Sequence, residues 1–372
     1  MLKNIISLHF DNNNSIKTLY LNTIYFVNFN KMSGKKIIYM CGSLNQTTML
    51  HRISEFLPEY DHYFTAYYSD GAERVAARMG MLDFSVLGGK FRQQTETYLK
   101  KNNLKIDYRA ESHDYDLAVV CSDLIMPKNL RTKKMVMVQE GMTDPENIFY
   151  HLVKKFRIPR YFGGTATTGL SDYYTYFCLA SEGYRNLFSR KGLKKEKLLV
   201  TGIPNFDNCK SFMNNDFQYK NYCLVCTSDS RETYKYENRK KFIEKAVKLS
   251  EGKKMIFKLH PNENSERAAK EINQYAPGSL VFADGNTNEM IANCDILITT
   301  FSTVVYVGIT LGKKVYSSFD LNELKQLMPI QNGGTSAKNI SKVCHALIEN
   351  KSVTEKEIMN NTGNFDIPNL AV

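Results

Sequence analysis

The sequence contains a segment, His260-Pro261-Asn262, in which a histidine directly follows an apolar run. Residues 254–259 predict a buried strand, and Pro261 prevents this strand from continuing, so His260 stands at its carboxyl end. Open α/β sheets bind ligands at that end, and the helix predicted over 265–275 starts nearby with N–H groups that attract phosphate. A histidine in this position can donate to a phosphate oxygen or to a leaving nucleotide. The competing interpretation is a loop residue without a role.

Two further polar segments follow predicted strands in the same half of the chain. Ser302 and Thr303 lie between a strand and a helix, where hydroxyls and the start of the helix form a small anion site. Thr227, Ser228 and Arg231 follow the first strand of this half, and hydroxyls beside a guanidinium suit phosphate contact. A plain helix cap and a polar turn are the alternatives. The Ser-Thr segment and the histidine segment fall on neighbouring strand–helix units, which predicts that together they hold one diphosphate.

A carboxylate in the N-terminal half could supply a base. Residues 134–138 predict a buried strand, and Glu140, followed by Gly141, stands at its carboxyl end. A partly desolvated glutamate has a raised pKa and could deprotonate the hydroxyl of an acceptor. The alternatives are a glutamate that caps a helix or forms a salt bridge, and Asp144 as the base in its place.

Weaker signals accompany these segments. Ser43, Asn45 and Gln46 follow the first predicted strand and could lie against the transferred group, although their segment is neither a GxGxxG motif nor a P-loop. Gly285 and Glu289 are placed to border a base or a ribose. The sequence has no GxSxG, HExxH or GxxxxGK[ST] motif and no well-placed DxD. We therefore predict a mechanism that uses no metal and no added cofactor.

Strands alternate with helices along both halves of the chain. Continuous apolar runs indicate strands buried on both faces, and apolar residues at 3.6-residue spacing indicate the helices between them. The predicted strands are 35–41, 62–68, 117–121, 134–139, 174–179 and 198–201 in the first half and 222–226, 254–259, 280–282, 295–299 and 314–316 in the second. The predicted helices are 46–57, 72–79, 91–100, 183–188, 240–249, 265–275, 288–292, 304–311 and 337–350.

This pattern predicts an α/β protein with two doubly wound, Rossmann-like domains that face each other across a cleft. The predicted organisation is an N-terminal extension over 1–34, an acceptor-side domain over 35–205, a linker over 206–221, a domain that binds the nucleotide donor over 222–350, and a C-terminal tail over 351–372.

Charge and composition narrow the class of protein. The 372 residues carry a formal net charge of +11, which favours anionic partners such as nucleotide phosphates, acidic glycans or lipid head groups. The basic clusters, among them Lys154 with Lys155, are either solvated helix faces or a rim that docks on the inner membrane leaflet. No nucleic-acid-binding motif occurs. Scattered cysteines in apolar runs, and the lack of a span of about 20 apolar residues, predict a cytoplasmic protein without a transmembrane helix.

The pair His260-Pro261, with Thr-Phe-Ser-Thr at residues 300–303, resembles GT-B transferases of bacterial surface polysaccharides. The most similar of these are CDP-glycerol glycerophosphotransferases, bacterial sialyltransferases and polysialyltransferases, and capsule Kdo transferases. The resemblance covers roughly residues 35–345 and implies the GT-B fold, with both motifs on the nucleotide. Bacterial sialyltransferases also carry an acidic pair before a glycine that supplies the general base. Gln-Glu-Gly at residues 139–141 looks like a variant with glutamine first.

A second family, the UDP-N-acetylglucosamine 2-epimerases, shares this fold. Thr201-Gly202 and Thr227 with Arg231 look like parts of its pattern. However, the Asp-Ser-Gly-Gly nucleotide turn of that family is replaced by residues 300–303. We keep the epimerase as the alternative activity.

Together these observations predict a metal-independent glycosyltransferase, or a related glycerophosphotransferase, that uses a CMP-, CDP- or UDP-linked donor. The acceptor would be a hydroxyl of a surface glycan or of a lipid-linked glycan, activated by Glu140 on the side of the cleft that carries Gly141. The alternatives are an epimerase and a non-catalytic scaffold that binds a nucleotide sugar. The predicted location is cytoplasmic, with peripheral contact on the inner face of the membrane as a further expectation.

Overall fold

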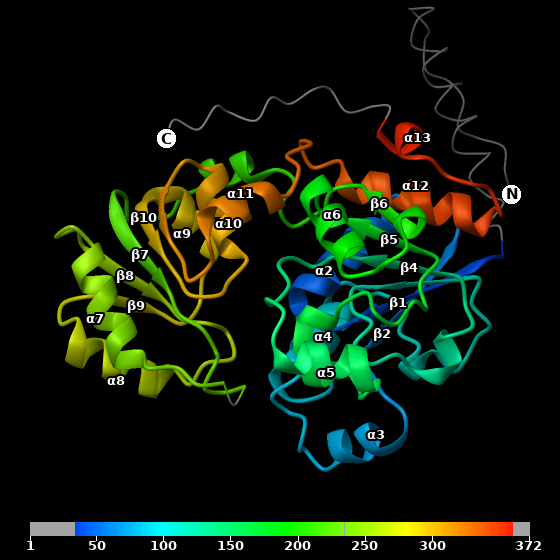
Figure 1. Cartoon of the computed structure of the whole chain (residues 1–372), viewed down its shortest axis with the longest axis horizontal. Helices are drawn as coiled ribbons and strands as arrows, with labels where there is room; N and C mark the ends of the chain where they lie inside the picture. Colours follow the sequence, from blue (N-terminus) through cyan, green and yellow to red (C-terminus); the bar gives the residue numbers. More distant parts are fainter. Residues whose placement is uncertain (1–33, 234, 360–372) are drawn as a thin grey trace, which may run out of the picture.

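A computed structural model describes residues 34–233 and 235–359. Most of the predicted N-terminal extension, and residues 360–372 of the predicted tail, lie outside the described residues. Two α/β domains stand side by side, each built on a parallel sheet (Figure 1). The predicted fold class is confirmed.

The first domain has a six-stranded parallel sheet in the order β2-β1-β3-β4-β5-β6. Its strands are β1 (Lys36–Cys41), β2 (Asp61–Ala66), β3 (Leu117–Val120), β4 (Met135–Val138), β5 (Tyr176–Leu179) and β6 (Leu198–Val200). Its helices are α2 (Leu44–Ser54), α3 (Gly71–Arg78), α4 (Gly89–Lys101), α5 (Ile148–Phe156) and α6 (Glu182–Arg190). Every residue of β3 and β4 is buried, as expected for a sheet covered on both faces.

The second domain has a five-stranded parallel sheet in the order β11-β10-β7-β8-β9. Its strands are β7 (Tyr222–Cys226), β8 (Met255–Lys258), β9 (Leu280–Phe282), β10 (Cys294–Ile298) and β11 (Lys314–Tyr316). Its helices are α7 (Arg239–Leu249), α8 (Ser265–Tyr275), α9 (Thr287–Asn293), α10 (Val304–Thr310) and α11 (Leu321–Leu327). Short 3₁₀ helices complete the fold: η1 (Tyr108–Ala110), η2 (Lys128–Leu130), η3 (Arg160–Thr167), η4 (Lys195–Lys197) and η5 (Cys209–Met213).

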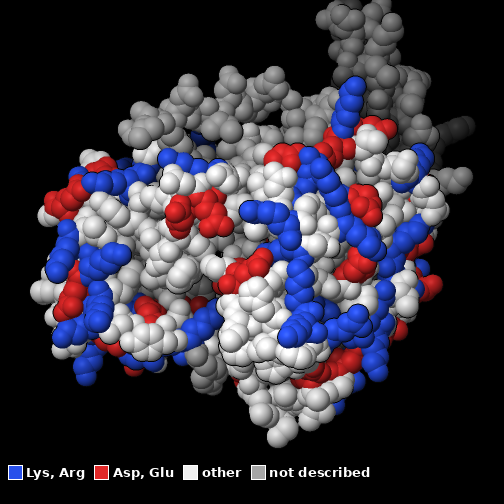
Figure 2. All heavy atoms as spheres, in the orientation of Figure 1, with Lys and Arg blue, Asp and Glu red and all other residues white. Residues whose placement is uncertain are grey.

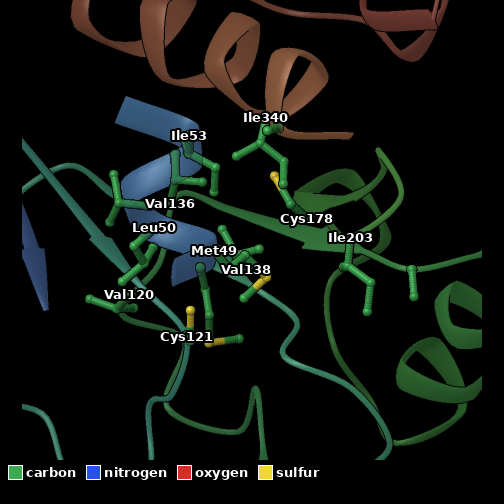
Figure 3. Close-up of a cluster of buried hydrophobic side chains, with 14 of the residues drawn as sticks. Met49, Leu50, Ile53, Val120, Cys121, Val136, Val138, Cys178, Ile203 and Ile340 are labelled. Atoms are coloured by element: carbon green, nitrogen blue, oxygen red, sulfur yellow. The ribbon is translucent and has the colours of Figure 1, made fainter. Parts of the chain in front are cut away.

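The chain returns to the first domain at its end. Helix α12 (Ser336–Ile348) lies against α2 and the six-stranded sheet, and Figure 3 shows Ile340 of α12 in the same apolar cluster as Ile53 and Cys178. Helix α13 (Glu355–Met359) follows α12, and Glu355 pairs with Arg185 of α6 at 2.7 Å. Residues 336–350 were predicted in the second domain; in the structure they complete the first. Apolar spacing predicted the helix, but it does not specify which sheet the helix covers.

The two domains share a buried boundary. The hydroxyl groups of Tyr184 in α6 and Tyr306 in α10 lie 2.6 Å apart, and both side chains are buried. Gly183 allows α6 to lie close to α11, because a Cβ atom at this position would meet the carbonyl oxygen of Gln326 at 1.9 Å. One apolar core runs from the first sheet to the near face of the second. The relative position of the domains is therefore held by close packing.

Three α-helices, α5, α11 and the five-residue α13, were not predicted from the sequence. Helix α5 places His151, Lys154 and Lys155 on one side, but it leaves Ile148, Phe149 and Phe156 exposed, so the structure covers only part of its apolar side. Helix α11 has only seven residues. The predicted crossover helix over 304–311 is confirmed as α10.

Within the described residues, no helix combines the length and the apolar character needed to cross a bilayer. All eight cysteines are buried and unpaired, in agreement with the interpretation that they are small apolar side chains.

Candidate active site

Glu140 lies directly beyond the end of β4, where it meets the start of α2. Its carboxylate accepts a hydrogen bond from Ser43 Oγ at 2.9 Å and another from Gln46 Nε2 at 2.5 Å. Ser43 is also the N-cap of α2, and its Oγ accepts from the backbone N–H of Gln46. The structure thus brings together three residues that the sequence placed on one side of the predicted cleft.

Burial raises the pKa of Glu140 above its ordinary value, and the hydrogen bonds from Gln46 and Ser43 counteract part of this rise. Both partners are neutral, so neither ties the carboxylate into an ion pair. A half-buried glutamate with a raised pKa and uncharged partners is suited to accept a proton.

Gln139, before the glutamate, holds the loop in place. Its buried side chain donates from Nε2 to the carbonyl oxygen of Gly141 at 2.7 Å and accepts from the N–H of Ala180 at 2.9 Å. An ionised acid could make only the second of these contacts, because a carboxylate has no donor. Glutamine at this position is therefore explained by the structure. The residue lies beside the site without facing it.

Gly141 is the point where the first domain touches the Ser-Thr segment of the second. A Cβ atom on Gly141 would lie 2.6 Å from Cγ2 of Thr303, so only a glycine allows this approach. Residue 140 and residues 302–303, which come from separate sheets, thus border the same space.

Asp144, the alternative base, is held by a different set of contacts. Its carboxylate accepts from Thr165 Oγ1 at 2.8 Å, and its backbone N–H donates to the same hydroxyl oxygen. Lys235 of the second domain lies 3.9 Å from it. The contacts with Thr165 hold the loop 141–147 against η3, so Asp144 stabilises the conformation of this loop. Its proximity to Lys235 adds a contact between the two domains.

His260 follows β8 as predicted and is half-buried. Its Nδ1 accepts from the backbone N–H of Asn262 at 3.2 Å, and the nearest oxygen of Asp229 is 3.6 Å from Nδ1. Burial lowers the pKa of His260, so the ring is neutral near pH 7. Because Nδ1 is an acceptor in this geometry, the proton is assigned to Nε2, which is left as a donor for a ligand. Asp229 is a neighbour that the sequence analysis did not single out.

The turn after β10 has unused hydrogen-bond donors. Among the described residues, the backbone N–H groups of residues 300–303 meet no hydrogen-bond acceptor. Thr303 is the N-cap residue of α10, yet its side chain makes no capping hydrogen bond. The simple capping role is therefore not fulfilled, and the turn offers N–H and hydroxyl donors to an anion.

The sheet order changes the predicted relation between these motifs. Strand β7 lies between β10 and β8, so His260 and Ser302 are two strand spacings apart, roughly 10 Å. They are not on adjacent strands, because the first strand of this domain is central in its sheet. One diphosphate between them is therefore a poorer fit than an extended nucleotide that reaches both.

The residues after β7 have internal partners. Thr227 Oγ1 donates to Glu263 at 2.5 Å and accepts from the backbone N–H of His260 at 3.3 Å, so it helps to fix the backbone at His260. Ser228 Oγ bonds to Glu237, and Arg231 makes a two-pronged ion pair with Glu271 at 2.8 Å. These contacts give all three predicted phosphate ligands a role within the protein.

The remaining predicted residues lie at the edges of the site. Gly285 is exposed at φ +107°, and Glu289, in the first turn of α9, accepts from Asn286 Nδ2 at 2.8 Å. Pro261 is exposed beside His260. Asn45 is exposed, and its carbonyl oxygen accepts from Asn205 Nδ2 at 3.4 Å. Within residues 34–233 and 235–359, no group of three or more metal-ligating side chains is arranged around a common point.

A hollow of about 380 Å³ lies at the domain boundary. The loop after Glu140 (residues 142–146) forms one wall of this hollow. The end of α6, with Leu187, Arg190 and Lys191, forms the second wall, and Phe319 with α11 forms the third. Arg190 and Lys191 are among its lining residues, and the Lys191 ammonium donates to the carbonyl oxygen of Ala166.

No protein-family model matches the sequence, and no curated protein matches it. Solved structures do match its fold. A variant of the wall teichoic acid polymerase TagF aligns with a TM-score of 0.50 at 11% identity, over 90% of this chain and 96% of that chain. A putative UDP-N-acetylglucosamine 2-epimerase from Listeria monocytogenes gives 0.54 at 11% identity, over 87% and 98%. The UDP-GlcNAc 2-epimerase from Neisseria meningitidis, bound to UDP-GlcNAc, gives 0.52 at 12% identity, over 83% and 99%.

At this level of identity the likeness establishes the fold, which is the GT-B arrangement of two Rossmann-like domains. Both kinds of relative that the motifs resemble occur among these structures. The fold does not distinguish a transferase from an epimerase.

Proposed function

We propose that this protein is a glycosyltransferase, or a related glycerophosphotransferase, that moves a group from a nucleotide-activated donor to a hydroxyl. The approach of Gly141 to Thr303 is the observation that carries this proposal. It sets a glutamate with a raised pKa in one domain against unpaired N–H and hydroxyl donors in the other. A base on one side and an anion site on the other are what transfer from a nucleotide requires.

In the proposed reaction, Glu140 removes the proton from the acceptor hydroxyl. The acceptor oxygen then bonds to the donor's anomeric carbon, or to phosphorus if glycerol phosphate is transferred. The bond from that atom to the leaving phosphate oxygen breaks, and its electron pair leaves with the nucleotide. His260 Nε2–H donates to the nucleotide phosphates, and the turn at 300–303 binds them from the other side of β7. Protein donors stabilise the developing charge, and no metal is invoked.

The nucleotide lies on the second domain in this proposal. Ser302 and Thr303 contact a phosphate, and Gly285 and Glu289 border the ribose or the base. Thr227, Ser228 and Arg231 support the loop under the donor. The acceptor, a surface glycan or a lipid-linked glycan, lies on the first domain near Ser43, Asn45 and Gln46. Their helix start also orients Glu140.

An epimerase is the second candidate, because UDP-GlcNAc 2-epimerases match this chain with TM-scores of 0.52 and 0.54. The two activities differ in whether an acceptor is needed. UDP-GlcNAc converted to its epimer in the absence of any acceptor would favour the epimerase. Tight nucleotide binding without turnover in either assay would indicate a non-catalytic scaffold.

The first test is a thermal-shift screen with CMP, CDP, UDP and GDP and their sugar or glycerol derivatives. It compares the wild type with His260→Ala and with His113→Ala, a control histidine that lies against Tyr63 in the first domain. We expect one nucleotide to stabilise the wild type and His113→Ala but not His260→Ala. If no nucleotide stabilises the wild type, the donor site is wrong. The successful nucleotide then enters a transfer assay with glycan acceptors.

A further inference from the structure

The segment Ile148–Phe156, with the 3₁₀ helix that follows it, has an unusual composition. Residues 148–162 contain five aromatic residues, four Lys or Arg residues and no Asp or Glu. Aromatic rings and long basic side chains are the types that lie at the boundary between water and lipid, where each has one apolar and one polar part. The first domain therefore carries a segment whose composition suits a membrane surface.

The structure exposes the apolar part of this segment. Sixteen large apolar side chains stand exposed in the described residues, and eight of them lie on α5, η3 and the region of α3. These eight are Ile148, Phe149, Phe156, Tyr161, Phe162, Val75, Met79 and Met81. Ile148 and Phe156 are 69% and 61% exposed, values that a helix face packed on a domain core does not have. We call these eight side chains, together with the exposed Lys155 and Arg157 beside them in the sequence, the aromatic-basic face.

The three segments form one surface. Helix α5 packs against η3, and Tyr161 of η3 lies beside Glu73 of α3. Figure 1 shows α3 and α5 at the same end of the first domain, and in Figure 2 the lower tip of this domain is largely uncharged, with Lys and Arg as well as Asp and Glu side chains close by. An exposed apolar surface of this kind, bordered by charges, indicates an interaction site.

The charged side chains on the aromatic-basic face indicate which kind of partner it binds. Lys155 and Arg157 stand exposed on the face and form no ion pair with any described residue. Arg74 and Arg78 of α3, likewise without an ion pair among the described residues, line a hollow of about 400 Å³. Arg92 and Arg109 line the same hollow, but they are paired with Glu96 and with Asp70 and Glu111. The acids of this region include Glu73 beside Tyr161, Asp83, which accepts from the N–H of Gly89, and Glu146, which stands exposed just before α5; Asp70 and Glu111 are paired with Arg109. Unpaired cations among exposed aromatic rings complement a surface that is apolar inside and anionic outside.

We propose that the aromatic-basic face docks this protein on an anionic lipid bilayer. Phe149, Phe156 and Phe162 enter the interfacial region, and Lys155 and Arg157 contact the lipid phosphates. The inference does not depend on the proposed reaction, because it concerns binding alone. It would bring the loop that carries Glu140, which ends where α5 begins, close to a lipid-linked acceptor.

The test is co-sedimentation of the full chain with phosphatidylcholine vesicles, with and without phosphatidylglycerol. The triple variant Phe149→Ser/Phe156→Ser/Phe162→Ser removes the apolar contacts, and Lys155→Glu/Arg157→Glu reverses the charges. Matched controls on the second domain are Val247→Ser, which alters an exposed apolar residue, and Lys245→Glu/Lys248→Glu, which reverses the same number of charges. Thermal midpoints and nucleotide-induced shifts of all variants verify the fold.

We expect the wild type and the controls to bind anionic vesicles, more weakly at high salt, and to bind neutral vesicles poorly. The charge-reversal variant should lose at least about tenfold in affinity, because a basic residue near an anionic membrane contributes to binding. The triple variant should lose at least about tenfold as well, because binding scales with the apolar area that enters the interface. Wild-type protein that remains free of anionic vesicles would overturn the proposal. So would face variants that bind as well as the controls. A face that mediates self-association would appear as a change in sedimentation without lipid in the triple variant, and would also overturn it.

Discussion

Glu140, which is half-buried, and Glu263, which is buried, both lie at the carboxyl end of a sheet, and burial raises the pKa of each. They differ in their partners. Glu140 meets only the neutral donors Ser43 and Gln46, whereas Glu263 lies 2.6 Å from Arg239 and accepts from Thr227. Arg239 neutralises the charge of Glu263. The carboxylate of Glu140 has no such cation and remains available to accept a proton.

The environment of Glu263 is a network of paired charges. Its carboxylate is fully buried, the Arg239 side chain is 3% exposed, and Glu237 and Arg231 lie around them. Through Thr227 this network supports the backbone at His260. A buried acid with a cation is thus structural, and a buried acid without one is a candidate for chemistry.

The largest expected effect is on turnover in Glu140→Gln. Removal of a general base lowers the rate by roughly 10²–10⁴-fold. The fold should persist, since Gln46 Oε1 is buried without a partner and can accept from the new amide once the Gln46 side chain turns. Measurement of kcat with the donor identified by the thermal screen checks this, with Asp144→Asn as the control. A larger loss in Asp144→Asn would reassign the base.

The counterpart in the second domain is Arg239→Met, which should affect stability. It leaves Glu263 buried without its cation, and loss of one partner of a buried ion pair costs about 3–5 kcal/mol in the free energy of unfolding. The folded-state pKa of Glu263 rises further, so the loss is fully present above that raised pKa, declines as the pH falls from it toward the ordinary value of about 4.5, and is absent below that value.

Urea unfolding at several pH values would test the Arg239→Met prediction. The double variant Arg239→Met/Glu263→Leu should recover much of the stability, because no charge is then left unpaired. A deficit that is independent of pH would mean that the arginine acts through packing and not through its charge.

A smaller effect is expected where the two domains touch. In Gly141→Ala the added methyl group would overlap Cγ2 of Thr303, which forces the loop and the turn apart. A shift of about 1 Å at a reacting centre can lower turnover by roughly 10²-fold. Thr303→Ser keeps the hydroxyl and removes the methyl group, so the double variant Gly141→Ala/Thr303→Ser should regain activity. Kinetics of the three variants test this, and no recovery in the double variant would contradict the steric explanation.

The smallest expected effect is a shift in the pH dependence of kcat/KM. Transfer requires ionised Glu140, so activity should decline as the pH falls through the raised pKa of this residue. Gln46→Met removes one of the two donors that favour the ionised form, which raises that pKa again. The acid limb of the kcat/KM profile should therefore move to higher pH, with little change at the optimum. An unchanged limb in Gln46→Met would mean that another group controls it.

Much of the site was accessible from local patterns. The apolar run 134–138 and the residues after it placed Glu140 at the end of a strand, and Pro261 ended the strand before His260. These predictions hold because strand burial and strand termination are properties of short segments. The structure also explains Gln139, whose donor and acceptor atoms both have partners.

Other features depended on contacts between distant segments. Arg231 reads as a phosphate ligand in the sequence, but Glu271, on a different helix, holds its guanidinium. The sequence analysis named the basic cluster Lys154 with Lys155, but it missed the exposed apolar residues of α5 around that cluster, because hydrophobicity alone does not say which apolar side chains are covered.

The sequence by itself determined the alternation of strands and helices, the α/β class and the segments that end at the edge of each sheet, since these follow from burial and spacing along the chain. Only the tertiary structure decided that β7 separates the His260 segment from the Ser-Thr segment, that α12 belongs to the first domain, and that Gly141 meets Thr303. The physical reason is that strand order and packing partners are chosen by long-range contacts. A strand buried on both faces has the same apolar pattern at every position within its sheet.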